Sequence, residues 1–374
     1  MAPRILAFAV LFLCSPTPAA DPPRAGPDLL RPFWQGEVVE GEPALFFREK
    51  ETEPARAKLL FPARKLVAVK NSAGDVVYRE GVDYRWTPGA VEISLPPGSR
   101  IPSSKSSDLR RPAGSQRYSL KHRDGGAEIM FGARLEYAAL QTCITYERAA
   151  GEWPVAPKFD PAALPRTRAR LSRRDPVSIV VLGDSISTGD NASGKFDAPP
   201  RQPGYPELLR RHLAARFGGE VRLTNLSVGG VDSRWGLGRI DKVAAARPDL
   251  VVIAFGMNDA GGRLPAEYQS NLKSLVAKIR AASPEAEFIL IASMLANPDW
   301  TALKHSFFPQ YRDKLRELVA PGVALADLAA VWAEFHCRKP DRDFTGNGVN
   351  HPNDFGHRVY AQVLAVALDP AFGR

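Results

Sequence analysis

The sequence contains few cysteines, and it lacks several motifs that would mark other enzyme classes. Only three of its 374 residues are Cys, and no Cys-x-x-Cys pair occurs. A zinc peptidase would need a motif such as His-Glu-x-x-His, and an α/β-hydrolase would need Gly-x-Ser-x-Gly. Neither motif is present. The composition, with 44% hydrophobic and 24% charged residues, is that of a folded globular protein.

The sequence also lacks long apolar runs. The apolar run near the N-terminus is short. Arg4 precedes an apolar run from Ile5 to Cys14, and small residues follow at Ala19 and Ala20. This pattern predicts a signal peptide over residues 1–20, with a membrane anchor as the alternative. No later stretch reaches the roughly 18 apolar residues of a membrane helix. We therefore expect a secreted or periplasmic protein with no integral membrane span.

Two cysteines remain after the predicted cleavage, Cys143 and Cys337. They are compatible with a disulfide between the two halves of the chain or with two unpaired thiols.

The net charge of +9 comes partly from one Arg-rich segment. An anionic partner is one interpretation of this segment. We favour a solvated linker without nucleic-acid binding, because no aromatic residues are interleaved with the arginines. The residues are Arg166, Arg168, Arg170, Arg173 and Arg174.

The first part of the mature chain has the pattern of a β domain. Short strand-like runs separated by turn residues predict one hairpin from residues 65–70 and 76–79 and a second from 82–86 and 91–95. Further strand-like residues occur at 127–135 and 138–146. Residues 21–150 are therefore predicted to form an all-β, sandwich-like domain. The Pro- and Arg-rich residues 151–175 are predicted to be an extended linker.

The remainder, residues 176–374, alternates apolar runs with helical segments. Runs rich in β-branched residues and flanked by helices predict a parallel sheet buried on both faces, in an α/β domain. The predicted strands are 178–182, 221–228, 250–255, 288–294 and 323–328, and the predicted helices are 205–217, 235–246, 265–282, 309–319 and 359–368. In such sheets the active site forms at the carboxyl ends of the strands.

A candidate nucleophile and its partners occur at two such places. Ser185 follows the first predicted strand in Gly-Asp-Ser, and Asp354 and His357 stand three residues apart near the last helix. Residues with that spacing share one face of a helical turn. A serine needs a neutral histidine as base, and the histidine needs a partner that orients it. Turn capping would explain each residue alone, but the combination predicts a catalytic triad.

Donors for an oxyanion hole follow the next two strands. Gly229 and Gly230 allow close approach of a backbone N–H group, and Asn258 offers a side-chain amide. Hydrolysis through a tetrahedral intermediate requires such donors.

In these residues and their spacing, the chain resembles the SGNH, or GDSL, hydrolase family from about Val177 to its C-terminus. The family blocks are matched by Gly183 to Ser187, Asn225 to Gly230, Gly256 to Asp259, and Asp354 to His357. The resemblance implies a flavodoxin-like α/β/α fold and a serine esterase without metal or cofactor. It implies Ser185, Asp354 and His357 as the triad, and Ser185, Gly230 and Asn258 as oxyanion donors. The β region is similar in position to the jelly-roll domain of some bacterial carbohydrate esterases.

The substrate is predicted from weaker signals. Secretion, the β domain and the neighbouring Arg234 and Trp235 favour an acetyl ester of a carbohydrate as substrate, since an exposed Trp can stack on a sugar. Packing of Trp235 under the next helix is the alternative. The sequence is also compatible with two alternatives, a lipase or phospholipase, and a surface carbohydrate-binding protein without activity.

Overall fold

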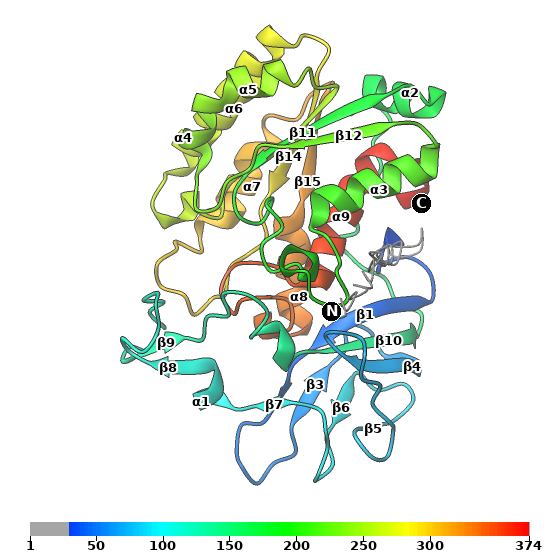
Figure 1. Ribbon diagram of the computed structural model, residues 1–374, viewed down its shortest axis with the longest axis vertical. Coiled ribbons are helices and arrows are strands. Elements are labelled where there is room, and N and C mark those ends of the chain that lie inside the picture. The colour runs from blue at the N-terminus through cyan, green and yellow to red at the C-terminus, as the bar shows by residue number, and fades with distance from the viewer. Residues whose placement is uncertain (1–29, 374) are drawn as a thin grey trace, which may run out of the picture.

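The computed structural model describes residues 30–373, which form a strand-rich N-terminal region and a C-terminal α/β domain (Figure 1). The predicted signal peptide, residues 1–20, lies outside the described residues. Within residues 30–373, no helix combines the length and apolarity that crossing a membrane requires.

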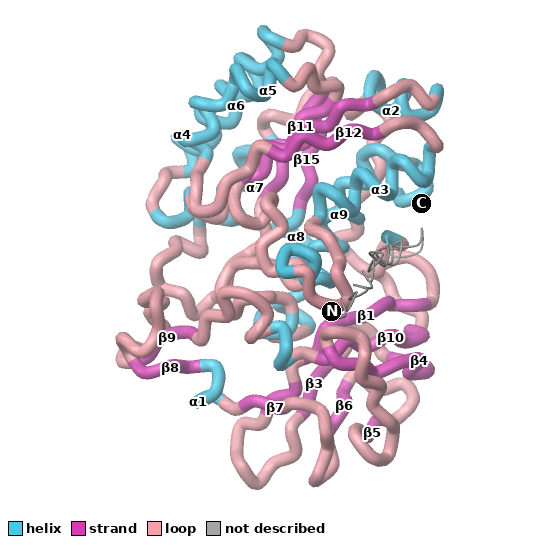
Figure 2. Tube along the Cα trace, viewed as in Figure 1, coloured by secondary structure: helices cyan, strands magenta, loops and turns pink. Residues whose placement is uncertain are grey.

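The N-terminal region contains three small sheets joined by long loops (Figure 2). A three-stranded antiparallel sheet has the order β1-β10-β4, a five-stranded mixed sheet has the order β5-β6-β3-β2-β7, and β8 pairs with β9. The strands are β1 (Val38–Ala44), β2 (Phe46–Phe47), β3 (Arg56–Lys58), β4 (Ala63–Asn71), β5 (Arg85–Trp86), β6 (Glu92–Ser94), β7 (Ser103–Ser104), β8 (Arg110–Pro112), β9 (Ala127–Ile129) and β10 (Thr142–Arg148). The prediction of a strand-rich region is thus confirmed.

Both predicted hairpins form, in shortened versions. After β4 the chain turns back so that Val77 pairs with Lys70, and β5 pairs antiparallel with β6. The strand predicted over 127–135 is limited to the three residues of β9, and a short helix, α1 (Ser106–Leu109), precedes β8. Most of the segment between α1 and β10 is loop (Figure 2).

The segment predicted to be an extended linker is packed against the domain instead. Its second half forms helix α2 (Pro165–Arg173), and Trp153 in its first half is buried against Phe33 and Phe335. A proline at the first helical position is compatible with helix formation, so the prolines do not prevent α2. Three of the arginines of α2 face carboxylates, with Arg170 3.2 Å from Asp249, whereas Arg168 lies over the ring of Phe159.

The C-terminal domain is built on a five-stranded parallel sheet with the order β12-β11-β13-β14-β15. This is the flavodoxin-like arrangement, and it confirms the predicted α/β fold. The strands are β11 (Val177–Gly183), β12 (Val221–Asn225), β13 (Leu250–Ala254), β14 (Glu287–Ala292) and β15 (Val323–Asp327). The central strands β13 and β14 are buried along their whole length, which explains their continuous apolar sequence.

Helices cover both faces of this sheet (Figure 1). Helices α3 and α9 pack together on one face, and α5, α6 and α7 lie on the other. The helices are α3 (Tyr205–Phe217), α4 (Ser233–Gly236), α5 (Ile240–Ala245), α6 (Pro265–Ala282), α7 (Phe307–Arg316), α8 (Leu328–Arg338) and α9 (Asp354–Leu368). Helix α8 was not predicted, and α9 begins five residues before the predicted helix at Val359.

The N-terminal region and the α/β domain share one apolar core. Phe33 and Trp153 from the N-terminal half pack against Phe335 of α8, which stacks on Phe344 at 4.2 Å between ring centroids. The ammonium group of Lys339, which is fully buried, bridges Glu42 of β1 and Asp343. Cys143 and Cys337 are free thiols, so the possible disulfide does not form.

Candidate active site

The turn after β11 presents Ser185 at the carboxyl end of the sheet. Only glycine fits at position 183, because a Cβ there would lie 2.4 Å from Ser187 Oγ and 2.7 Å from the carbonyl oxygen of Ala254. The carboxylate of Asp184 accepts the Ile186 N–H at 3.0 Å and so fixes the turn. Ser185 is 7% exposed, in the place predicted for the nucleophile.

The histidine that contacts this serine is His351. Its Nε2 atom lies 2.8 Å from Ser185 Oγ, and its Nδ1 atom lies 2.7 Å from Oδ1 of Asn191. His351 stands in the loop before α9, where the side chain of Asn347 accepts the N–H groups of residues 349, 350 and 351. The loop is therefore held in one conformation around the imidazole.

The structure does not bring Asp354 and His357 to Ser185, and the predicted triad is corrected here. His357 Nε2 lies 3.1 Å from the carbonyl oxygen of Asp190, and its Nδ1 accepts the N–H of Tyr205 at 3.4 Å. The carboxylate of Asp354 accepts the N–H of Ser193 at 2.8 Å. Helix α9 is capped by Asn353, so its first turn directs His357 into the core, where it is fully buried.

Burial shifts the pKa values of these groups away from their usual ranges. Burial lowers the pKa of His351 to about 4, against an opposing effect of the nearby Asp190 charge. The pKa of His357 is also lowered to about 4 by burial, and burial raises the pKa of Asp354 to about 6. At neutral pH both imidazoles are therefore uncharged, and His351 can accept a proton from Ser185.

The predicted oxyanion donors lie beside this pair. A Cβ at Gly229 would lie 3.7 Å from the Cβ of Ser185, which places the glycine loop next to this serine. Gly230 has a φ of +77°, a conformation that favours glycine. In the part of the chain that the structure describes, the backbone N–H groups of Ser185 and Gly230 donate to no protein acceptor.

Asn258 is tied to the same loop. Its Nδ2 donates one hydrogen bond to the carbonyl of Val231 at 2.8 Å, which leaves its second amide hydrogen available. The buried carboxylate of Asp259 accepts the N–H of Gly256 and the hydroxyl of Ser233. The Gly-x-Asn-Asp turn and the glycine loop are thus fixed to each other.

The two residues predicted to bind substrate differ in their surroundings. Arg234 is exposed at the start of α4, whereas Trp235 is half-buried and packs against the core. The guanidinium of Arg239 lies 4.3 Å from the centre of the Trp235 ring. One face of this ring is therefore occupied, as the packing alternative predicts.

The sequence pattern did not identify His351 as the partner of Ser185, nor Asn191 as the partner of His351. His351 could have been identified, because the segment before it is rich in turn residues and Asn353 is a good N-cap, which places His351 in a loop and His357 inside a helix. Asn191 gave no comparable signal. It follows Ser185 by six residues in an irregular turn that no periodicity describes.

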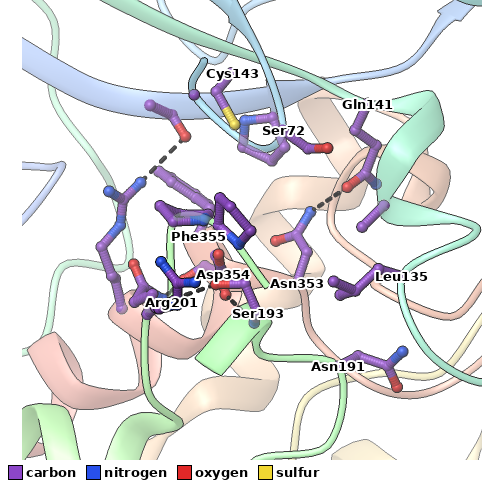
Figure 3. A pocket seen from close by; sticks show the side chains of 18 of the residues that line it. Ser72, Leu135, Gln141, Cys143, Asn191, Ser193, Arg201, Asn353, Asp354 and Phe355 are labelled. Carbon is purple, nitrogen blue, oxygen red and sulfur yellow. Dashed lines mark hydrogen bonds between the residues drawn. The ribbon is translucent and has the colours of Figure 1, made fainter. Parts of the chain in front are cut away.

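The cavity shown in Figure 3 lies between the two parts of the chain, next to this site but separate from it. Its volume is about 320 Å³, and Asn191, Asp354 and Arg358 are among the lining residues, whereas Ser185 and His351 are not. Asp354 points toward Ser193 in this view. Within residues 30–373, no group of three or more His, Cys, Asp or Glu side chains is arranged to hold a metal ion.

A family model and several solved structures match the C-terminal domain. The model described as the GDSL-like lipase/acylhydrolase family matches residues 181–359. No curated protein matches the chain. A two-domain esterase, CEX, which is active on acetylated mannans, is 22% identical with a TM-score of 0.46. That match covers 59% of this chain and 56% of the CEX chain, so this protein spans little more than half of its length.

Two further solved structures match this chain over nearly their whole length. Axe2, an acetylxylan esterase from Geobacillus stearothermophilus, is 19% identical with a TM-score of 0.44, over 53% of this chain and 96% of its own. The lipase/acylhydrolase from Enterococcus faecalis is 25% identical with a TM-score of 0.42, over the same shares of the two chains.

Proposed function

Because residues 181–359 form a domain of the GDSL-like lipase/acylhydrolase family, we propose that this protein is a serine esterase in which His351 activates Ser185. The observation that carries the proposal is the distance of 2.8 Å between His351 Nε2 and Ser185 Oγ. This is hydrogen-bond reach, the geometry that proton transfer from a nucleophile to its base requires.

The reaction proceeds through an acyl-enzyme. Ser185 Oγ attacks the ester carbonyl while His351 Nε2 takes its proton, and the resulting oxyanion accepts hydrogen bonds from the N–H groups of Ser185 and Gly230 and from the Asn258 amide. Collapse of the intermediate breaks the bond to the alcohol, which leaves with the proton from His351. A water molecule then repeats these steps on the acyl-enzyme and releases the acid.

Asp354 and His357 have no part in this proton transfer. Their side chains bind backbone groups of residues 190, 193 and 205, which belong to the segment from Ser185 to the first residue of α3. We assign both to the support of that segment.

The substrate we propose is a short acyl ester, an acetyl ester of a carbohydrate. The apolar cavity beside Ser185 and His351 is lined by neither residue. A long acyl chain attached to Ser185 would therefore not lie in this cavity. Arg234 is exposed next to the glycine loop and is available to a polar substrate. The signal-like residues 1–20 support action outside the cytoplasm, where polysaccharides occur.

An acyl-ester panel tests this function. Wild type, Ser185→Ala and His351→Ala are assayed with p-nitrophenyl acetate, p-nitrophenyl palmitate and acetylated oligosaccharides. We expect wild type to hydrolyse the acetate and the oligosaccharides, and both variants to lose that activity. Preference for the palmitate would indicate a lipase, binding of the sugar without hydrolysis would indicate a carbohydrate-binding protein, and full activity of Ser185→Ala would overturn the mechanism.

A further inference from the structure

We propose that Asn191 takes the place of the triad carboxylate, and that the N-terminal β region holds Asn191 in position through the backbone at Gly132 and Arg134. The N-terminal region is then part of the catalytic centre. This inference rests on the proposed esterase function and concerns the same site.

The hydrogen bonds of Asn191 fix which way its amide faces. Its Nδ2 lies 2.5 Å from the carbonyl oxygen of Arg134 and 3.3 Å from those of Gly132 and Gly346. Carbonyl oxygens only accept hydrogen bonds, so the amide nitrogen must face them. The other end of the side chain, Oδ1, therefore faces His351.

This orientation determines the tautomer of His351. Asn191 Oδ1 can only accept, and it lies 2.7 Å from His351 Nδ1, so the ring proton is on Nδ1. The lone pair of Nε2 is then directed at Ser185 Oγ, 2.8 Å away. Asn191 thus does for the imidazole what a triad carboxylate does, except that it is neutral.

The three carbonyls also explain why this residue is Asn and not Asp. An ionised Asp at position 191 would direct a carboxylate oxygen at three carbonyl oxygens, which repel it. The backbone of Asn191 has a φ of +64°, a left-handed conformation that Asn adopts more readily than most residues. Both features favour the amide.

The usual place of the triad Asp is closed in this chain. With His351 as the base, the position three residues before it is Gly348, where an Asp-x-x-His block would carry its carboxylate. Gly348 has a φ of +85°, and a Cβ there would lie 2.3 Å from the carbonyl oxygen of Met130 and 2.8 Å from the ring of Tyr137. The N-terminal region fills the space that an Asp side chain would need.

The same N-terminal segment also contacts the loop of the base. The N–H of Gly132 donates to the carbonyl of Asn347 at 3.0 Å, and the Asn347 side chain holds the N–H of His351. Residues 130–137 therefore contact Asn191, Gly348 and the turn that presents His351. This segment, far from residues 185 and 351 in sequence, joins the two halves of the site.

Substitution of Asn191 tests its role. In Asn191→Ala we expect kcat on p-nitrophenyl acetate to fall by on the order of 10²-fold with KM little changed, because the ring loses its orientation but Ser185 and His351 remain. The acid limb of the kcat/KM profile should move to lower pH, because the protonated ring of His351 loses a hydrogen-bond acceptor. The other ionisable groups that act on this ring, Asp190 and His357, are unchanged in the variant. Asn191→Asp should not restore the wild-type rate at pH 7.

Asn353→Ala is the matched control. Asn353 is also buried and also binds the N-terminal region, through Gln141 at 2.9 Å, but it does not contact His351. We expect this variant to lower the melting temperature and leave the pH profile unchanged. Wild-type kcat and pH profile in Asn191→Ala would overturn the proposal. If Ser185→Ala and His351→Ala are inactive in the same assay, the esterase function stands and only the role of Asn191 fails.

A second pair of variants tests the contribution of the N-terminal region. In Gly132→Ala the added Cβ would lie 2.8 Å from Tyr137, so the carbonyl that holds Asn191 must shift. In Gly151→Ala, in the same half of the chain, the nearest atom would be 4.0 Å away. We expect Gly132→Ala to lower kcat at least about tenfold and Gly151→Ala to behave as wild type. Equal kcat in both variants would overturn the proposal. So would a recovery of activity in the double variant Asn191→Ala/Gly348→Asp, because an Asp at position 348 could then still orient His351.

Discussion

His351 and His357 stand six residues apart, yet of the two only His351 contacts Ser185. The Nε2 atom of His351 lies 2.8 Å from Ser185 Oγ, whereas both ring nitrogens of His357 face backbone groups. The difference follows from the start of α9, because residue 351 precedes the helix and residue 357 lies inside it.

Substitution of the two histidines should separate a catalytic from a structural role. We expect His351→Ala to lower kcat on p-nitrophenyl acetate by on the order of 10³-fold or more, because Ser185 loses its base. His357→Gln can still donate to the Asp190 carbonyl and should keep most of the activity. The measurement is steady-state kinetics, with circular dichroism to check folding. The reverse ranking of the two variants would return the role of base to His357.

The activity should extend to acidic pH. The base must be neutral, and burial lowers the pKa of His351 to about 4, so protonation disables the site only near and below that value. We expect kcat/KM for p-nitrophenyl acetate to remain nearly constant from pH 7 to about pH 5 and to fall near pH 4. Released p-nitrophenol is measured by chromatography, with circular dichroism at each pH as the control for acid unfolding. A midpoint near the usual histidine value of about 6.5 would contradict this environment.

The α/β domain was predictable because strands buried on both faces consist of continuous apolar runs in the sequence. Runs such as residues 250–255 are continuously apolar because β13 is buried on both faces, and turn residues mark where each strand ends. The same pattern placed Ser185, Gly230 and Asn258 at one edge of the sheet. The positions of Ser185 and of the predicted oxyanion donors therefore followed from local sequence.

His351 and Asn191 did not follow from this strand pattern. Asp354 and His357 have a triad-like spacing, but spacing within a helix does not say whether the shared face points to the active site or into the core. Asn191 is placed by carbonyls of residues 132 and 134, which are far away in sequence. The packing of residues 151–175 also depended on distant contacts, since Trp153 is buried against Phe33 and Phe335.

Asp354→Asn should stabilise the protein above neutral pH. Burial raises the folded-state pKa of Asp354 to about 6 from the usual 3.8, so the fold favours the protonated carboxyl. That contribution to stability is present below about pH 4 and is lost as the pH rises through 6. We expect the uncharged Asn to increase the free energy of unfolding by up to about 3 kcal/mol at pH 8, and by much less at pH 4.

Urea denaturation at the two pH values measures this difference. Activity on p-nitrophenyl acetate should stay close to wild type, because Asp354 contacts neither Ser185 nor His351. A loss of 10²-fold or more in kcat would place Asp354 back in the catalytic machinery.

Removal of the Asn258 amide should slow turnover. We expect Asn258→Ala to lower kcat by on the order of 10²-fold or more with little change in KM, because the donor acts on the oxyanion that develops in the transition state. Asn271→Ala is a suitable control, since Asn271 is buried nearby and binds the hydroxyl of Ser233 but is not a predicted oxyanion donor. A wild-type rate for Asn258→Ala would remove it from the oxyanion hole.

Loss of the Lys339 charge should destabilise the junction between the N-terminal region and the α/β domain. Lys339 Nζ lies 2.6 Å from Glu42 and 3.3 Å from Asp343, and all three side chains are shielded from water. Lys339→Met leaves two buried carboxylates without a cation, which costs about 3 to 5 kcal/mol. Lys65→Met is the control, because Lys65 pairs with Glu147 at 3.6 Å on an exposed surface and should change stability by less than about 1 kcal/mol. Urea denaturation at pH 7 measures the free energy of unfolding of both variants. A small decrease of similar size in both would show that the buried ion pair contributes little to holding Glu42 of β1 against α8.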